Sequence, residues 1–127
     1  MILLDTNALI WALTGSRRLG PGASELLASR HPAHYSSVSV EEMMIKSLSG
    51  RLEVPEGICE RLDALGLRQL PFVGEHAEAF TAFPELVGHD PFDRALLAQA
   101  EVEGLTFLTA DRRILALGKP WIVDAAN

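Results

Sequence analysis

Four acidic residues stand at the ends of predicted strands or the starts of predicted helices, where a hydrophobic core has no use for them. They are Asp5, Glu42, Asp93 and Asp111. Asp5 follows the apolar run 2–4, and Asp111 follows the apolar run 107–109. In open α/β sheets, residues after the carboxyl ends of strands line the ligand crevice. We therefore expect one fold to bring all four carboxylates to a single edge.

Carboxylates gathered at one place repel one another, and their pKa values rise unless a cation neutralises them. Oxygen ligands of this kind suit the hard cations Mg²⁺ and Mn²⁺. The sequence therefore predicts metal-assisted chemistry on an anionic substrate, with phosphodiester hydrolysis as the favoured reaction.

Each carboxylate also has a purely structural interpretation as a helix cap. Asp5 and Asp111 fit N-cap positions, Asp90 fits the N-cap before Pro91, and Asp93 then lies in the first helical turn. Glu42 fits the third position of a capping box that begins at Ser39. The helical phase of residues 40–52 permits either Glu41 or Glu42 to face the site, so periodicity leaves this choice open.

The order of predicted elements alternates between strands and helices. Strands are expected at residues 2–4, 34–37, 68–70, 106–108 and 121–123. Helices are expected to begin near Thr6 or Asn7, at Pro21, Ser39, Pro55, Glu75, Pro91 and Arg112. We expect a single domain over residues 1–127. Its fold class is α/β, a three-layer α/β/α sandwich around a mostly parallel, roughly five-stranded sheet.

Composition narrows the class of protein. The chain has 127 residues, 48% of them hydrophobic, which is enough for a core without disulfides. No apolar run approaches the roughly 18 residues of a membrane span, and we expect no signal peptide. The single cysteine, Cys59, fits a reducing cytosol. We therefore expect a cytoplasmic protein.

The charge balance argues against a nucleic-acid binder that works by bulk electrostatics, because the net charge is −6. That objection weakens when the predicted site is set aside. Without the five carboxylates Asp5, Glu42, Asp90, Asp93 and Asp111, the net charge would be −1.

Other catalytic or metal-binding patterns do not occur in the sequence. The four histidines, His31, His34, His76 and His89, have no metal-ligand spacing, and we interpret them as surface or packing residues. His89 adjoins the acidic motif and is the one with a possible part in the site. The sequence contains neither a G-x-G-x-x-G motif nor a Walker loop.

Four short segments stand in an order and at spacings that are together specific. They are LLDTN at 3–7, VSVEE at 38–42 with Ile45-Lys46 downstream, HDPFDR at 89–94 with LLAQA at 96–100, and LTAD at 108–111. With these segments the chain resembles PIN-domain proteins, and specifically the VapC toxins of bacterial or archaeal toxin–antitoxin pairs. The resemblance runs from Met1 to about Val123.

The resemblance implies a PIN-like fold and an endoribonuclease that depends on Mg²⁺ or Mn²⁺. It favours Glu42 over Glu41, and it makes the catalytic and metal-binding set Asp5, Glu42, Asp93 and Asp111. Asp5 and Asp93 are the first candidates for direct ligands. Thr109 would support Asp111 or a bound water, and Thr6, Asn7 and Asp90 would support the set. Candidate RNA contacts are Lys46, Arg94 and Arg112. The implied partners are an RNA substrate, a VapB-like antitoxin and a second copy of the chain.

Two other classes of function stay open at this point. A metal-dependent phosphatase would use Asp5 as a nucleophile, although Asn7 occupies the place where such enzymes usually have a second Asp. A non-catalytic interaction module with the PIN fold would bind a partner without cutting RNA. The sequence does not indicate which RNA is the target.

Overall fold

The computed structural model describes residues 1–29 and 32–127. Five parallel strands form one sheet in the order β3-β2-β1-β4-β5. The strands are β1 (Ile2–Leu4), β2 (Ala33–Ser36), β3 (Arg68–Leu70), β4 (Thr106–Thr109) and β5 (Ile122–Asp124). The all-parallel sheet confirms the predicted fold class.

The central strand β1 is covered on both faces, which explains why it is apolar throughout. All three of its residues are fully buried. Ile2 and Leu4 point into one core cluster and Leu3 into the other, as the two-residue period of a strand requires. The sheet therefore separates two hydrophobic cores, each closed by a layer of helices.

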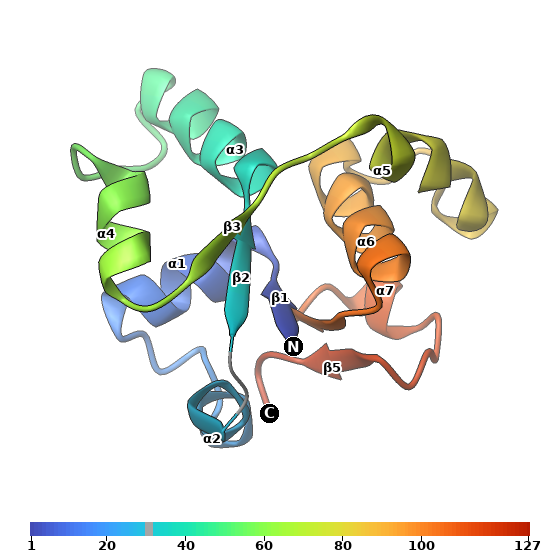
Figure 1. Cartoon of the computed structure of the whole chain (residues 1–127), viewed down its shortest axis with the longest axis horizontal. Coiled ribbons are helices and arrows are strands. Elements are labelled where there is room, and N and C mark those ends of the chain that lie inside the picture. The colour runs from blue at the N-terminus through green and yellow to red at the C-terminus, as the bar shows by residue number, and fades with distance from the viewer. Residues whose placement is uncertain (30–31) are drawn as a thin grey trace.

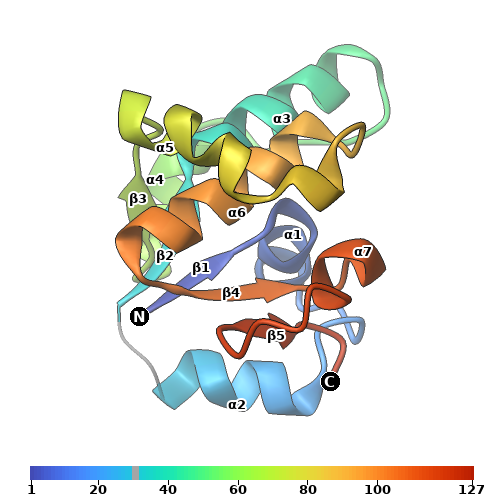
Figure 2. The same cartoon turned by 90° about the vertical axis from the view of Figure 1, so that its right-hand side faces the viewer.

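The helices form the outer layers of this sandwich (Figures 1 and 2). One core is closed by α1 (Thr6–Thr14), α2 (Pro21–Ser29) and α4 (Ile58–Ala64). On the other side lie α5 (Gly74–Glu78), α6 (Pro91–Glu103) and α7 (Arg112–Leu115), with the 3₁₀ turns η1 (Ala79–Ala82) and η2 (Pro84–Leu86). The helix α3 (Ser37–Leu48) continues from β2 and contacts both α1 and α6.

The start of α3 corrects the predicted capping box. The N-cap is Ser36, whose hydroxyl accepts a hydrogen bond from the Val38 amide, so the helix begins at Ser37. Ser39 is instead buried, and its hydroxyl accepts a hydrogen bond from Thr6 Oγ1. Ser36, Ser37 and Ser39 could each cap the helix. The N-cap is Ser36, the residue at which β2 stops pairing with β3.

Three further helix predictions were wrong in detail. The helix predicted from Pro55 begins at Ile58, because Gly57 adopts a left-handed conformation before it. The helix predicted over residues 75–83 ends at Glu78 and continues as the 3₁₀ turn η1. The apolar residues used to set the phase of α3 do not all face the core, since Val40 packs against it whereas Leu48 is 90% exposed.

No helix among residues 1–29 and 32–127 is long and apolar enough to cross a membrane.

The strand order reverses between β1 and β4. From β1 the chain moves outward to β2 and β3, and it then returns to the other side of β1 to form β4 and β5. The carboxyl ends of β1 and β4 therefore lie at the point where the strand order reverses, which is where such sheets bind ligands. The Asp5 amide extends this pairing by donating to the Leu108 carbonyl at 3.0 Å.

Candidate active site

Asp5 lies directly after β1 and is only 3% exposed. It caps α1, because its Oδ1 accepts a hydrogen bond from the Ala8 amide at 2.7 Å. Its Oδ2 accepts a second hydrogen bond from the Thr109 hydroxyl at 2.6 Å. The capping interpretation is therefore correct for Asp5. Capping engages Oδ1, whereas Oδ2 is held by the Thr109 hydroxyl at the end of β4.

Thr109 ties together the ends of the two central strands. Its buried hydroxyl donates to Asp5 and accepts a hydrogen bond from the Asp111 amide at 3.1 Å. Asp111 caps α7, with Oδ1 accepting from the amides of Arg113 and Ile114. Thr109 thus contacts the backbone amide of Asp111 and the carboxylate of Asp5, and the supporting role assigned to Thr109 stays a prediction.

Glu42 is buried on α3, whereas its neighbour Glu41 is exposed. One oxygen of Glu42, Oε2, forms an ion pair with Lys46 Nζ at 2.9 Å. The other oxygen, Oε1, is buried and finds no hydrogen-bond partner among residues 1–29 and 32–127. An unsatisfied buried carboxylate oxygen is costly, so this oxygen is a ready ligand for a cation.

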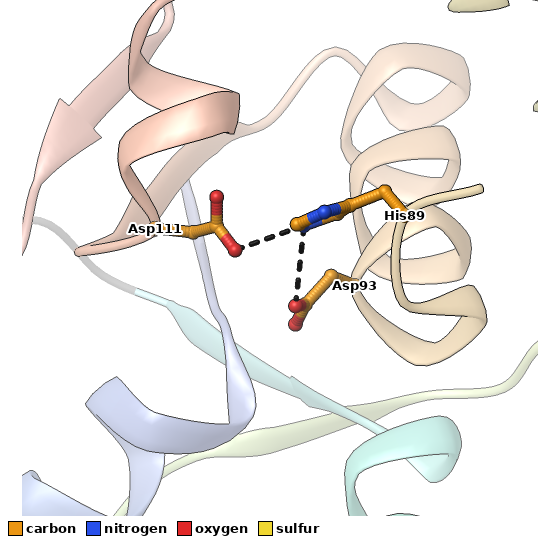
Figure 3. A group of neighbouring side chains, drawn as sticks. All are labelled: His89, Asp93 and Asp111. Carbon is orange, nitrogen blue, oxygen red and sulfur yellow. Dashed lines mark hydrogen bonds and ion pairs between the residues drawn. The ribbon is translucent and has the colours of Figure 1, made fainter. Parts of the chain in front are cut away.

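Asp93 lies in the first turn of α6, which begins after the N-cap Asp90. Asp90 Oδ1 accepts from the Phe92 amide at 2.8 Å, so its structural interpretation is also correct. Figure 3 shows Asp93 and Asp111 both directed at the same nitrogen of the His89 ring. His89 Nε2 lies 2.9 Å from Asp111 Oδ2 and 3.6 Å from Asp93 Oδ2. The two carboxylates thus come from different elements and share one partner.

The site carries more negative charge than its nearby cations balance. Burial raises the pKa of Asp5 from 3.8 to about 6, and the charges of Asp111 and Glu42 add to the rise, against the hydrogen bonds from Thr109 and Ala8. Burial likewise raises the pKa of Asp93 from 3.8 to about 7, and the charge of Asp90 contributes next, followed by the other three site carboxylates. These shifts mark the four predicted acids as one electrostatic unit.

The donor set fits a hard divalent cation. Single ligand atoms of His89, Asp93 and Asp111 lie within 4.8 Å of one another. Asp5 and Glu42 raise the pKa of Asp93 by their charge, and Glu42 adds the unpartnered oxygen. Several carboxylate oxygens around one point are the ligands that Mg²⁺ and Mn²⁺ take.

The family of the chain follows from sequence comparison. The model of the PIN domain family matches residues 2–120, which is nearly the whole chain. The chain belongs to the PIN domain family. No curated protein has a sequence that matches.

Solved structures with the same PIN fold agree with this assignment. A toxin–antitoxin complex from Klebsiella pneumoniae is 22% identical with a TM-score of 0.67, covering 97% of this chain and 96% of that one. VapBC2 from Rickettsia felis, bound to a promoter DNA fragment, is 20% identical with a TM-score of 0.67, covering 98% and 97%. DNA-bound VapBC from Salmonella typhimurium is 20% identical with a TM-score of 0.63, covering 97% and 95%. The predicted resemblance is thereby confirmed.

Two of the predicted supporting residues of this PIN domain, Thr6 and Asn7, differ in burial. Thr6 is buried and bonds Ser39, which joins the start of α1 to α3. Asn7 is exposed on the first turn of α1. The roles assigned to both residues stay predictions.

The three candidate RNA contacts differ in what they touch. Lys46 is already paired with Glu42 at the site. The guanidinium of Arg94 lies 5.3 Å from the centre of the Phe80 ring. Arg112 is 81% exposed and pairs with Asp124 at 3.6 Å. Lys46 is therefore the candidate that the fold places against the carboxylates.

Sequence reasoning gave too little weight to His89 and did not single out Arg113 beside it. His89 contacts Asp111, 22 residues away, and Arg113 Nη1 lies 3.3 Å from His89 Nδ1. The available signal was that His89 directly precedes the acidic N-cap of α6 and stands four residues before Asp93. Of the other histidines, His76 is a buried packing residue and His31 lies outside the described residues.

Proposed function

We propose that this PIN-domain protein is a metal-dependent endoribonuclease and the toxin component of a toxin–antitoxin pair. The observation that carries the proposal is the mutual influence of four carboxylates from four separate elements, since the charges of Asp5, Glu42 and Asp111 all raise the pKa of Asp93. Two of them, Asp5 and Asp93, have raised pKa values, and the third, Glu42, keeps a buried oxygen without a partner. Helix capping and the Lys46–Glu42 ion pair account for part of this arrangement, but they leave carboxylate repulsion that a bound cation would relieve.

A bound Mg²⁺ or Mn²⁺ would be held by Asp5, Glu42 and Asp93, with Asp111 completing the set directly or through water. Such an ion activates a water and offsets negative charge on the scissile phosphate. No side chain is assigned the role of nucleophile. The two oxygens of Asp5 are already oriented by Ala8 and Thr109, which suits a ligand better than an attacking group.

The positively charged side chains near the carboxylates would bind the phosphates of the substrate. Lys46 holds one oxygen of Glu42 and is partly exposed, so its ammonium can also meet a phosphate of the substrate. Arg94 and Arg112 would contact the RNA backbone farther from the carboxylates. These contacts would position a strand without reading its sequence.

The direct test is RNA cleavage by the purified protein in Mg²⁺, in Mn²⁺ and in EDTA, with a phosphate monoester as a parallel substrate. We expect RNA cleavage that requires metal and no turnover of the monoester. Cleavage of the monoester would favour the phosphatase alternative. Absence of both activities, in protein that binds metal, would favour an interaction module.

We further propose a cognate antitoxin, a homodimer and a cytoplasmic place of action. The similar solved structures are a toxin–antitoxin complex and VapBC complexes, which supports an antitoxin partner. An Arg or Lys of that partner could pair with the site carboxylates in place of metal. Exposed apolar residues on α3, including Met44 and Leu48, support self-association. Co-purification of a protein encoded next to this one would test the partner.

A further inference from the structure

The His89 ring is held from both of its nitrogen atoms. Nε2 lies between two carboxylates, 2.9 Å from Asp111 Oδ2 and 3.6 Å from Asp93 Oδ2 (Figure 3). Nδ1, on the opposite side of the ring, lies 3.3 Å from Nη1 of Arg113. A second guanidinium nitrogen of Arg113 donates to the Glu85 carbonyl at 3.4 Å, so that side chain is anchored at two points.

These contacts determine which nitrogen of the neutral ring carries the hydrogen. A guanidinium can only donate, so Nδ1 of His89 must accept from Arg113. The single ring hydrogen then belongs to Nε2, which donates it to Asp111. The ring therefore presents an N–H group, and not a lone pair, to the two carboxylates.

This tautomer matters because His89 stands where it could bind a metal ion. His89, Asp93 and Asp111 each have a ligand atom within 4.8 Å of the others. One imidazole nitrogen with two carboxylates would favour Zn²⁺, Co²⁺ or Ni²⁺ over Mg²⁺. A nitrogen that carries hydrogen cannot coordinate, so the same three residues then offer only carboxylate oxygens.

We propose that Arg113 sets the metal selectivity of the site by fixing the tautomer of His89. Arg113 occupies the Nδ1 lone pair, so His89 donates from Nε2 to Asp111 and stays out of the coordination shell. The site is thereby kept as an all-oxygen site for Mg²⁺ or Mn²⁺. This inference rests on the proposed metal-dependent function and adds a selectivity residue to it.

The substitution that tests the proposal is Arg113→Met, which removes the donor and keeps much of the side-chain length. Its control is Arg112→Met, which removes the same charge from the same helix at a side chain that faces Asp124. Losing one positive charge near the site raises the affinity for every divalent cation. The informative quantity is therefore the ratio of Zn²⁺ to Mg²⁺ affinity, measured by calorimetry.

We expect this ratio to rise about tenfold in Arg113→Met, the low end for a hydrogen bond to a charged group. It should stay unchanged in Arg112→Met. Adding His89→Gln to Arg113→Met should abolish the gain, because the amide lacks the imidazole nitrogen. An unchanged ratio in Arg113→Met, or an equal rise in Arg112→Met, would overturn the proposal.

Nitrogen-15 NMR of the histidine side chains gives a readout independent of activity. In metal-free wild type, His89 should carry hydrogen on Nε2 alone, and it should keep that hydrogen when Zn²⁺ is added. In Arg113→Met, Zn²⁺ should remove it. Hydrogen on Nδ1 in the wild type would overturn the inference. If hydrogen lies on Nδ1 in a protein that cleaves RNA with Mg²⁺, the inference fails and the proposed function stands. Absence of divalent-ion binding would overturn both the inference and the proposed function.

Discussion

Asp5→Asn separates the structural role of this residue from its proposed catalytic role. The substitution keeps the size of the side chain and removes one negative charge. The amide oxygen can still accept from the Ala8 backbone, so α1 stays capped. If Asp5 were only a cap, RNA cleavage would stay close to that of the wild type, whatever the change in stability.

The expected change in the free energy of unfolding follows from the electrostatics of the folded site. Folding raises the pKa of Asp5 from 3.8 to about 6, so the folded carboxyl holds its proton more tightly than the unfolded one. The cost of this shift is absent below pH 3.8 and complete above pH 6, where it amounts to about 3 kcal/mol. Asn is neutral at every pH and avoids this cost. Without metal at pH 8, Asp5→Asn should therefore be more stable by up to about 3 kcal/mol.

Urea and thermal unfolding in EDTA at pH 8 and at pH 4 measure this difference. The gain at pH 8 should appear as a rise in Tm of roughly 10 °C and should largely disappear at pH 4. Mn²⁺ should stabilise the wild type and have little effect on the variant. RNA cleavage should fall at least ~100-fold, as expected when a key charge is lost. A variant that is no more stable than wild type at pH 8, or that cuts RNA at the wild-type rate, would refute the reasoning.

Three further predictions concern the unmodified protein. Mg²⁺ or Mn²⁺ at about 100 times its Kd should stabilise the fold by about 2.7 kcal/mol, because the ion relieves carboxylate repulsion that exists only in the folded state. A melting temperature that does not respond to metal titration would contradict a preformed site. In EDTA, stability should fall as pH rises from 4 to 8, because the folded-state pKa values of Asp5 and Asp93 are raised to about 6 and about 7. Denaturant midpoints that stay flat over this pH range would count against the raised pKa values. Saturating Mn²⁺ should reduce the dependence of stability on pH. By light scattering at micromolar concentration, the protein should have about twice its 13.8 kDa mass, and a monomer would exclude the proposed dimer.

The sequence by itself predicted the α/β sheet and the positions of Asp5 and Asp111 after strands. Residues 2–4 are apolar without interruption, as expected of a short strand buried on both faces. An acid directly after such a strand must lie at the carboxyl edge of a parallel sheet. The same argument holds for Asp111 after β4. These inferences need only local pattern and the geometry of parallel strands, which is why they agree with the structure.

Tertiary structure decided which of three serines caps α3 and which of two adjacent glutamates is buried. Ser36, Ser37 and Ser39 are all competent caps, and only the point where β2 stops pairing with β3 selects Ser36. Helical phase allowed either Glu41 or Glu42 to face the site, because Leu48 was assumed to face the core. Leu48 is in fact exposed. Packing of α3 between α1 and α6 buries Glu42 and leaves Glu41 in solvent.

The contacts of His89 could not be read from the sequence at all. Its partners Asp111 and Arg113 lie 22 and 24 residues away, on an element that reaches it only because β4 is inserted beside β1. Local patterns fix which side chains stand at the end of a strand or the start of a helix. Contacts between these side chains depend on distances between segments that only the folded chain brings together. The same distances decide which nitrogen of His89 carries a hydrogen and which carboxylate oxygen is left without a partner.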